Sequence, residues 1–226
     1  MYHPDELTHR AISESKPQGM LGPVLAVVAV PNIYLNPTHR FSREQAEQFF
    51  AEFENTNPYW NGECLSRNAD GDSGIVRGFR CWVQPVMGNE QGPGNVGDRH
   101  NVILHDDGKI TQVSSFLPSV ISVDGSEIHG VPSETIEYAL TTAVAAASTV
   151  KKVHGEAAAT YRVSVGTERL PTLTEADSKS RNLTEMVFHP FARNIHFGRG
   201  ENEQVRSLVL DVLNQYGIEE TSETVV

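Results

Sequence analysis

The chain has 226 residues, of which 38% are hydrophobic and 21% charged, and this composition is typical of a globular protein with one large domain or two small ones. Its 18 lysines and arginines against 29 aspartates and glutamates give a formal net charge of -11, which disfavours nucleic-acid binding unless a local basic patch overcomes the repulsion. No apolar run approaches the roughly 20 residues of a membrane-spanning helix, so the sequence predicts no membrane contact.

Residues 1–20 lack the pattern of a core element. Acids, bases and a histidine stand where a secretory signal has a cationic start and an apolar middle, so we expect the protein in the cytoplasm. The two cysteines, Cys64 and Cys81, are too few for a disulfide framework. We interpret residues 1–20 as a loosely ordered lead-in in which residues 4–13 can form a short helix, residues 21–217 as a single α+β domain, and residues 218–226 as a flexible tail.

Three segments define the expected start of this domain. Residues 21–30 form a continuous valine-rich run between Gly-Pro and Pro-Asn pairs, which predicts a strand buried on both faces. Ser42 followed by Gln45 is a capping-box pattern, and it opens an amphipathic helix over residues 42–54 with phenylalanines on its inner face. Residues 75–84 alternate between apolar and polar, so we expect one long strand with one wet side.

Two Asp-Gly pairs indicate chain reversals in the middle of the sequence. Residues 101–105 and 109–115 are joined through Asp106-Asp107-Gly108, and Asp-Gly supplies the positive φ angles of a tight hairpin turn. A second Asp-Gly pair follows residues 120–123. The middle of the chain is therefore predicted to be an antiparallel meander.

The second half begins with the clearest helix. Residues 132–154 carry apolar positions at helical spacing, cations in the last turn and a following glycine. We then expect a strand over residues 159–165, a long linker over residues 166–200, and a last helix capped by Asn202 and ended by Gly217. This order predicts an α+β fold in which helices cover one face of a mostly antiparallel sheet, with the ferredoxin-like split βαβ arrangement as its specific version.

The sequence contains no assembled motif for a metal, a cofactor or a nucleophile. Residues 92–97 match G-x-G-x-x-G, but phosphate binding by that motif needs a helix after it, and a strand is predicted here. Residues 68–74 offer oxygen atoms at alternate positions yet lack the glycine and bidentate acid of a calcium loop. Neither H-E-x-x-H, G-x-S-x-G nor a P-loop occurs, so we expect no metal ion and no cofactor.

An enzymatic function would have to use dispersed residues. The least unfavourable acid–base candidates are His105, Glu127, His129 and His196. Glu127 and His129 lie on one predicted strand and could act as base and orienting group only beside a cleft. This alternative requires the candidate side chains to converge from separate parts of the chain.

Residues 179–199 are the most suggestive segment for binding. Basic and aromatic side chains alternate there, and Glu185 is its only acid. Such a mixture can stack on bases or hold phosphates. The candidate ligand-binding or nucleic-acid-binding residues are Arg181, Phe188, His189, Arg193, His196 and Arg199. In the alternative interpretation, the phenylalanines pin a long loop to the body while the charges point to water.

The order of several short motifs resembles that of a known family. The motifs are G-F-R-C-W-V at 78–83, H-D-D-G-K-I at 105–110, and the elements expected over residues 132–154, 161–165 and 202–217. Over residues 22–217 they resemble an uncharacterised actinobacterial module that follows Schlafen/AlbA-type DNA-binding domains. The family's nucleic-acid and ATP binding belongs to the AlbA-type domain, which would lie upstream of the part matched here. The resemblance therefore implies a companion domain and transfers no functional residue.

These observations favour a non-enzymatic cytoplasmic binding or accessory domain, associated with a DNA-linked system, whose partner is a protein or an anionic ligand. Two alternatives remain open. One is an enzyme with a dispersed acid–base site. The other is a structural module that oligomerises through an exposed sheet face around Arg80 and Trp82.

Overall fold

A computed structural model of the chain describes residues 3–15, 24–33, 35, 38–56, 74–84, 87–88, 99–115, 119–123, 126–154, 160–168, 173–174, 188–198 and 200–216. The helices in this part of the chain are α1 (Pro4–Ser15), α2 (Arg43–Thr56), α3 (Ser133–His154) and α4 (Glu201–Asn214). The strands are β1 (Val24–Pro31), β2 (Val76–Gly78), β3 (Cys81–Val83), β4 (Met87–Gly88), β5 (Arg99–His105), β6 (Ile110–Ser115), β7 (Ser119–Val123), β8 (Ser126–Pro132), β9 (Thr160–Glu168), β10 (Leu173–Thr174) and β11 (Phe191–His196).

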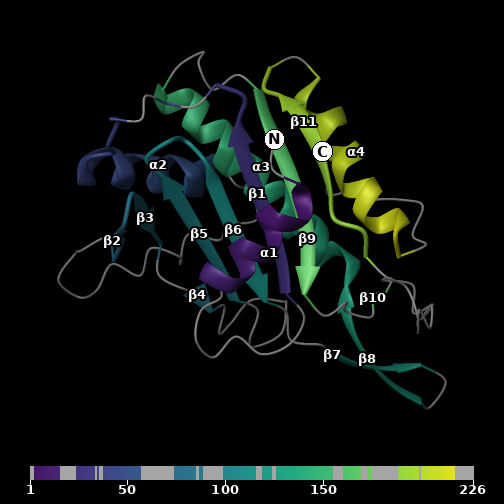
Figure 1. Cartoon of the computed structure of the whole chain (residues 1–226). Coiled ribbons are helices and arrows are strands. Elements are labelled where there is room, and N and C mark those ends of the chain that lie inside the picture. The colour runs from purple at the N-terminus through teal and green to yellow at the C-terminus, as the bar shows by residue number, and fades with distance from the viewer. Residues whose placement is uncertain are drawn as a thin grey trace.

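The main sheet has the strand order β11-β9-β1-β6-β5-β3-β2, with β4 paired to β5 outside this path (Figure 1). All its neighbouring strands run antiparallel. β1 and β5, which are connected through α2, are separated by β6, whereas β6 and β9, connected through α3, are separated by β1. Each βαβ unit is thus split by a strand of the other, which confirms the α+β class and the predicted split βαβ arrangement.

A smaller sheet lies apart from the main one. β7 and β8 pair antiparallel, which confirms the reversal predicted after residue 123, and β10 pairs parallel to β8. Figure 1 shows the β7–β8 hairpin extending away from the body of the molecule. The hairpin is continuous with α3, because β8 ends at Pro132 and α3 begins at Ser133.

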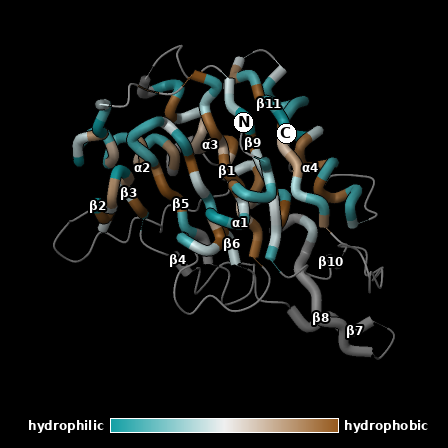
Figure 2. Tube along the Cα trace, viewed as in Figure 1, coloured by the Kyte–Doolittle hydropathy of each residue, from teal (hydrophilic) through white to brown (hydrophobic). Residues whose placement is uncertain are grey.

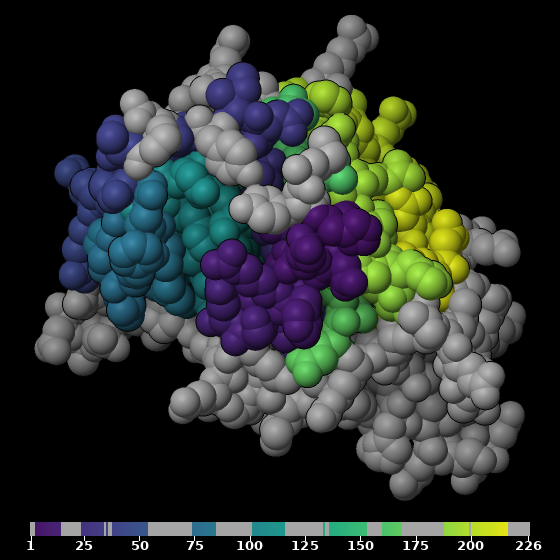
Figure 3. All heavy atoms as spheres, in the orientation of Figure 1, coloured from purple at the N-terminus to yellow at the C-terminus, as the bar shows by residue number. Residues whose placement is uncertain are grey.

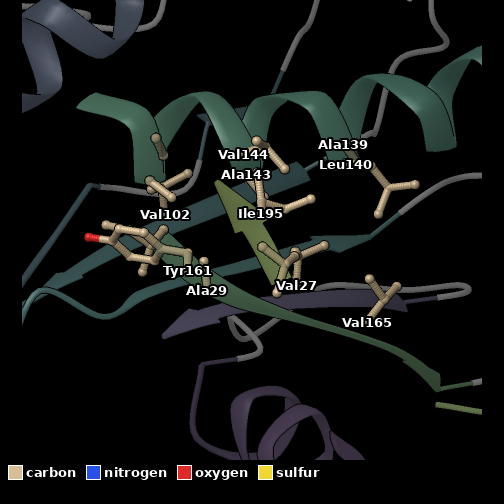
Figure 4. Close-up of a cluster of buried hydrophobic side chains, with 14 of the residues drawn as sticks. Val27, Ala29, Val102, Ala139, Leu140, Ala143, Val144, Tyr161, Val165 and Ile195 are labelled. Carbon is tan, nitrogen blue, oxygen red and sulfur yellow. The ribbon is translucent and has the colours of Figure 1, made fainter. Parts of the chain in front are cut away.

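Helices α2, α3 and α4 cover one face of the main sheet and form the principal core with it. Figure 4 shows α3 lying across the strands, with its small residues Ala139 and Ala143 toward the sheet. Alanine at these positions lets the helix approach closely. The alternation predicted for β9 is confirmed, because Tyr161, Val163 and Val165 are all buried in this core. Hydrophobic residues are accordingly concentrated in the central strands and in α3 (Figure 2).

Helix α1 covers the opposite face of the sheet, where it packs on β9, β1 and β6 (Figure 3, purple). Ala11 and Ile12 are buried there in a second cluster with the valines of β1. The approach is close, since a Cβ atom on Gly166 of β9 would lie 2.3 Å from Oγ1 of Thr8. The helix expected in residues 4–13 is confirmed, but its packing on the sheet differs from the expected loose lead-in and from the expectation that helices cover a single face. The double burial predicted for β1 is confirmed, because α1 supplies the second covering layer.

Local sequence signals succeed at α2 and fail just after it. The capping box is formed, because the Ser42 amide donates to Oε1 of Gln45 at 2.9 Å and the Gln45 amide donates to Oγ of Ser42 at 3.1 Å. The single long strand expected over residues 75–84 is wrong, since the chain reverses between β2 and β3 at Phe79 and Arg80. Arg80 adopts a left-handed φ of 57°, a conformation that sequence rules expect of Gly or Asn.

The end of the described chain also differs from expectation. β9 continues to Glu168, and β11 lies within the predicted linker and pairs with β9. β11 escapes the pattern rules because its exposed and partly buried positions do not alternate cleanly. The N-cap of α4 is Gly200, with a φ of 80°, rather than Asn202. Gly217 lies outside the described residues.

Candidate functional site

Asp106 organises one end of the main sheet. It lies in the turn between β5 and β6, and its carboxylate is fully buried. Arg77 of β2 donates to both carboxylate oxygens, at 3.0 and 2.7 Å. The Phe41 amide, which precedes α2, donates to the same carboxylate at 3.1 Å, and Nε of Arg40 lies 3.5 Å away. One buried carboxylate therefore joins the β5–β6 turn, the β2–β3 hairpin and the start of α2.

The main chain of Asp106 strengthens this junction. Its amide donates to the Arg80 carbonyl at 2.9 Å, and its carbonyl lies 3.1 Å from Nδ1 of His39. Burial alone would raise the pKa of Asp106, but the hydrogen bonds from Arg77 and the Phe41 amide outweigh burial and hold that pKa below its usual value. The carboxylate is thus ionised at neutral pH and fully committed to hydrogen bonds, as a structural junction requires and a catalytic acid does not.

The inner side of the β2–β3 hairpin is held by Trp82. The indole Nε1 donates to the Phe41 carbonyl at 2.9 Å, and the Arg77 guanidinium lies 5.1 Å from the ring centroid of Trp82. Trp82 is only 7% exposed. The sheet face around Trp82 is therefore packed, and the exposed face expected there for oligomerisation is not formed by this residue.

The outer side of the same hairpin is open to solvent. Phe79 occupies the tip and is 94% exposed, and Val76 of β2 is 59% exposed. With Ile33, these are the large hydrophobic residues that the described part of the chain leaves exposed. Figure 3 shows the hairpin (blue) at the surface, on the same side of the molecule as α1. Sequence reasoning missed this feature, because Phe79 falls on the inner face of the long strand that the alternation predicts.

His105 and Cys81 are neighbours across β5 and β3 but are not poised for chemistry. Burial, with a smaller effect from Lys109, lowers the pKa of His105 to about 3. The imidazole is therefore neutral at pH 7, a weak base, and lies 3.0 Å from Oγ1 of Thr111. Burial raises the pKa of the Cys81 thiol despite the opposing charge of Arg77, so the nucleophilic thiolate is disfavoured.

The two acid–base candidates whose side chains the structure describes, His105 and His196, do not converge. His196 ends β11, where its Nδ1 lies 2.9 Å from Oγ1 of Thr160. His105 ends β5, four strands away, so strand spacings of about 4.8 Å separate the two histidines by about 19 Å. Glu127 and His129 belong to β8 in the smaller sheet, and their side chains lie outside what the structure describes.

The basic and aromatic segment places its phenylalanines in the core. Phe188 is 8% exposed, and its ring centroid lies 6.4 Å from Phe191 and 6.2 Å from Tyr216. Phe197 is also buried and packs edge-on against Tyr161. This arrangement matches the alternative in which the aromatic rings pin the segment to the body, and these rings are not available to stack on bases.

The basic members of that segment have separate positions. Arg193 forms an ion pair with Asp211 of α4, and His189 is exposed. Arg181 and Arg199 lie outside the described residues.

Two glutamines, Gln204 in α4 and Gln215 directly after it, bond to the main chain at the two ends of the β11 segment. Oε1 of Gln204 accepts from the His196 amide at 2.9 Å, while its Nε2 donates to the His196 carbonyl at 3.1 Å. Gln215 makes the same pair of bonds with the amide and carbonyl of His189, at 2.8 and 3.3 Å. The Gln204 carboxamide thus bonds to the outward main-chain groups of the last residue of β11, and the Gln215 carboxamide fixes the chain that leads into the strand.

Three further observations bear on the class of function. Among the residues that the structure describes, no group of three or more His, Cys, Asp or Glu side chains could hold a metal ion. No helix in the same part of the chain is long and apolar enough to cross a membrane. No family model, no curated protein and no solved structure matches this chain. The resemblance to the actinobacterial companion module therefore stays a prediction.

Proposed function

We propose that this chain is a non-enzymatic accessory domain that binds a partner protein through the outer side of its β2–β3 hairpin. The observation that carries the proposal is the exposure of Phe79 at the tip of a hairpin whose inner side is firmly anchored. The resemblance to a companion of DNA-binding domains supports a role within a DNA-linked system.

An aromatic side chain at this position is suited to act as a binding anchor. Burying a phenylalanine side chain fully contributes about 1.5 to 3 kcal/mol, and aromatic residues dominate the few positions that carry most binding energy. Val76 extends the apolar surface beside Phe79. Because Asp106 and Trp82 hold the hairpin in place, little conformational entropy is lost when a partner docks.

The packing of the sheet argues against nucleic acid as the partner. Modules that bind single-stranded RNA on a four-stranded sheet stack bases on aromatic residues of the open face. Here α1 covers that face, and β1 presents Val24, Ala26 and Val28 to it. The net charge of -11 adds long-range repulsion of phosphates.

Site-specific photocrosslinking tests the proposal directly. A benzophenone amino acid replaces Phe79 in the full chain, produced in its native cells, and crosslinked proteins are identified by mass spectrometry. The matched control carries the same group at Ile33, which is 65% exposed and lies beyond the end of β1, three strands from β3. We expect a partner that is captured from position 79 and not from position 33.

The captured partner is then purified and its dissociation constant measured. Phe79→Ala should weaken binding about tenfold or more, while Ile33→Ala should leave it unchanged. Equal affinity for the wild type and Phe79→Ala would remove the proposal. Binding of a labelled oligonucleotide that depends on Phe79 and weakens steeply with salt would replace it with a nucleic-acid function.

A further inference from the structure

Resting on this proposed function, we infer that the partner contributes a short, extended and acidic segment that pairs with the outer edge of β2. The inference concerns the chemical class of the partner and the way it binds, and it follows from the hydrogen-bond phase of the hairpin, the direction of one arginine side chain and the charge distribution of the chain.

The phase of the β3–β5 ladder shows which main-chain groups face outward. The Gln84 amide bonds to the Val102 carbonyl at 3.1 Å, and the Arg80 carbonyl accepts from the Asp106 amide at 2.9 Å. Alternate residues of an antiparallel strand bond to opposite neighbours, so Trp82 bonds toward β5 and its two flanking residues bond toward β2. Their partners are Gly78 and Val76. The amide and carbonyl between these two, those of Arg77, therefore point to the outer edge.

The side chain of Arg77 does not protect this edge. Charged residues on an outer strand normally discourage pairing with another chain. The guanidinium of Arg77 is instead turned onto the carboxylate of Asp106 and the ring of Trp82. The edge of β2 thus presents outward main-chain groups between the exposed side chains of Val76 and Phe79. Because β2 has only three residues, it can form one pair of main-chain hydrogen bonds with an added strand, which is too short an edge to promote extended aggregation.

The charges around the hairpin select an acidic segment. Among the described residues of the hairpin, of the neighbouring β5–β6 turn and of the segment before α2, they are those of Arg40, Arg77, Arg80, Lys109, Asp106 and Asp107, four cations against two anions. The whole chain carries -11, so these residues hold a local excess of cations in an acidic protein. A short acidic segment meets only the local field, whereas a long polyphosphate would also meet the repulsion of the rest.

Strand addition is a recognised way to bind a peptide, in which main-chain bonds give affinity and side-chain contacts give specificity. In this case the main-chain bonds are those of Arg77, and the apolar contact is with Phe79. The opposite edge of the main sheet differs, because α4 packs on β11 and Gln204 bonds to the outward amide and carbonyl of His196 at the end of that strand.

The test uses the full chain and an eight-residue peptide of alternating glutamate and valine, capped at both ends and labelled for fluorescence anisotropy. One twin has lysine in place of glutamate. A second twin is N-methylated at alternate residues, which removes the amide donors of one edge and keeps the charge. A twenty-nucleotide thymidine oligomer serves as the polyphosphate probe. Hydrogen exchange of the Arg77 amide is followed by NMR in each case.

We expect the acidic peptide to bind at least about tenfold more tightly than the lysine twin and to slow exchange of the Arg77 amide about tenfold. N-methylation on the pairing edge and Phe79→Ala should each weaken binding about tenfold, and Ile33→Ala should not. Three outcomes would each overturn the inference. The acidic and lysine peptides could bind equally well, the N-methylated twin could bind as well as the acidic peptide, or only the oligonucleotide could protect the Arg77 amide.

The two proposals fail separately. A crosslinked partner whose affinity depends on Phe79 but whose binding leaves the Arg77 amide unprotected would preserve the accessory function and remove strand addition. A partner whose affinity is indifferent to Phe79 would remove both.

Discussion

The two outer strands of the main sheet face their surroundings in different ways. At β11, Gln204 of α4 bonds to the main chain of His196 at the end of the strand, and Arg193 pairs with Asp211 of α4. At β2, the hydrogen bonds that Asp106 accepts anchor the inner side of the β2–β3 hairpin, whereas Val76 and Phe79 are exposed on its outer side. Natural sheets usually protect both edges. Among the described residues, a helix packs on β11 whereas no strand pairs with the outer side of β2, and the binding proposal rests on this contrast.

Replacing one phenylalanine by alanine at each of these two edges should give the largest difference in stability. Phe188, which leads into β11, is buried against Phe191 and Tyr216, so Phe188→Ala should lower the free energy of unfolding by about 3 kcal/mol or more. Phe79→Ala removes an exposed ring and should change it by less than about 0.5 kcal/mol. Urea denaturation of both variants measures the difference. A large loss in Phe79→Ala would mean that the hairpin tip serves stability rather than contact.

Removing the carboxylate of Asp106 should destabilise the packing of the β2–β3 hairpin on the sheet. Asp106→Ala leaves the buried Phe41 amide without its partner and releases Arg77, which we expect to cost about 2 to 3 kcal/mol of unfolding free energy. Asp107→Ala is the matched control, because Asp107 only accepts from the Lys109 amide in the turn and its loss should cost about 1 kcal/mol or less. Both are measured by urea denaturation. Equal losses in the two variants would show that Asp106 is not the junction of this edge.

The pH dependence of stability tests the burial of His105, which belongs to the β2 side through its pairing with Cys81. The pKa of His105 falls from 6.5 to about 3 on folding, so between these values the unfolded chain binds the extra proton. Stability should therefore fall as the pH is lowered below 6.5, by up to about 1.4 kcal/mol per pH unit from this group.

His105→Gln should remove that contribution while keeping a polar group beside Thr111. The measurement is the urea midpoint of both proteins between pH 7.5 and about pH 5.5, where carboxylates with ordinary pKa values of about 4 remain largely ionised. Parallel pH profiles for the two proteins would contradict a buried, neutral imidazole.

Among the variants designed to remove a structural contact, the smallest loss of stability is expected at the β11 edge. Gln204→Ala removes two hydrogen bonds to His196 and should cost about 1 kcal/mol, with faster hydrogen exchange of the His196 amide. Gln204→Glu keeps the acceptor for that amide and loses the donor to the carbonyls of His196 and Gly200. Its exchange rate should stay close to that of the wild type. An unchanged exchange rate of the His196 amide in Gln204→Ala would show that Gln204 does not protect the main chain at the end of β11.

Local signals in the sequence predict much of this fold. Ser42 and Gln45 make their capping box, and the Asp106-Asp107-Gly108 turn joins β5 to β6, with Gly108 at a φ of 86°. These patterns depend on residues that are close in sequence, so they can be recognised from the sequence alone. The same is true of the valine-rich β1, whose double burial the absence of polar alternation predicts.

Features that depend on distant partners could not be predicted in this way. Arg80 adopts its left-handed φ where its carbonyl bonds to Asp106, and no turn dipeptide announces the reversal. The contacts of Asp106 with Arg77 and Phe41 join positions far apart in the chain. Candidate residues chosen for their chemistry alone, such as His105, gave no sign that burial would suppress it.

The interleaving of the two βαβ units also determines when the molecule can fold during synthesis. β1 is flanked by β6 and β9, so one of its edges lacks a partner until residue 168 has left the ribosome. Until then the nascent chain carries a valine-rich segment with one unpaired side, which is the kind of sequence that associates between chains. Fragments that stop before β9 should therefore precipitate when expressed, and refolding of the whole chain should be slow for its size.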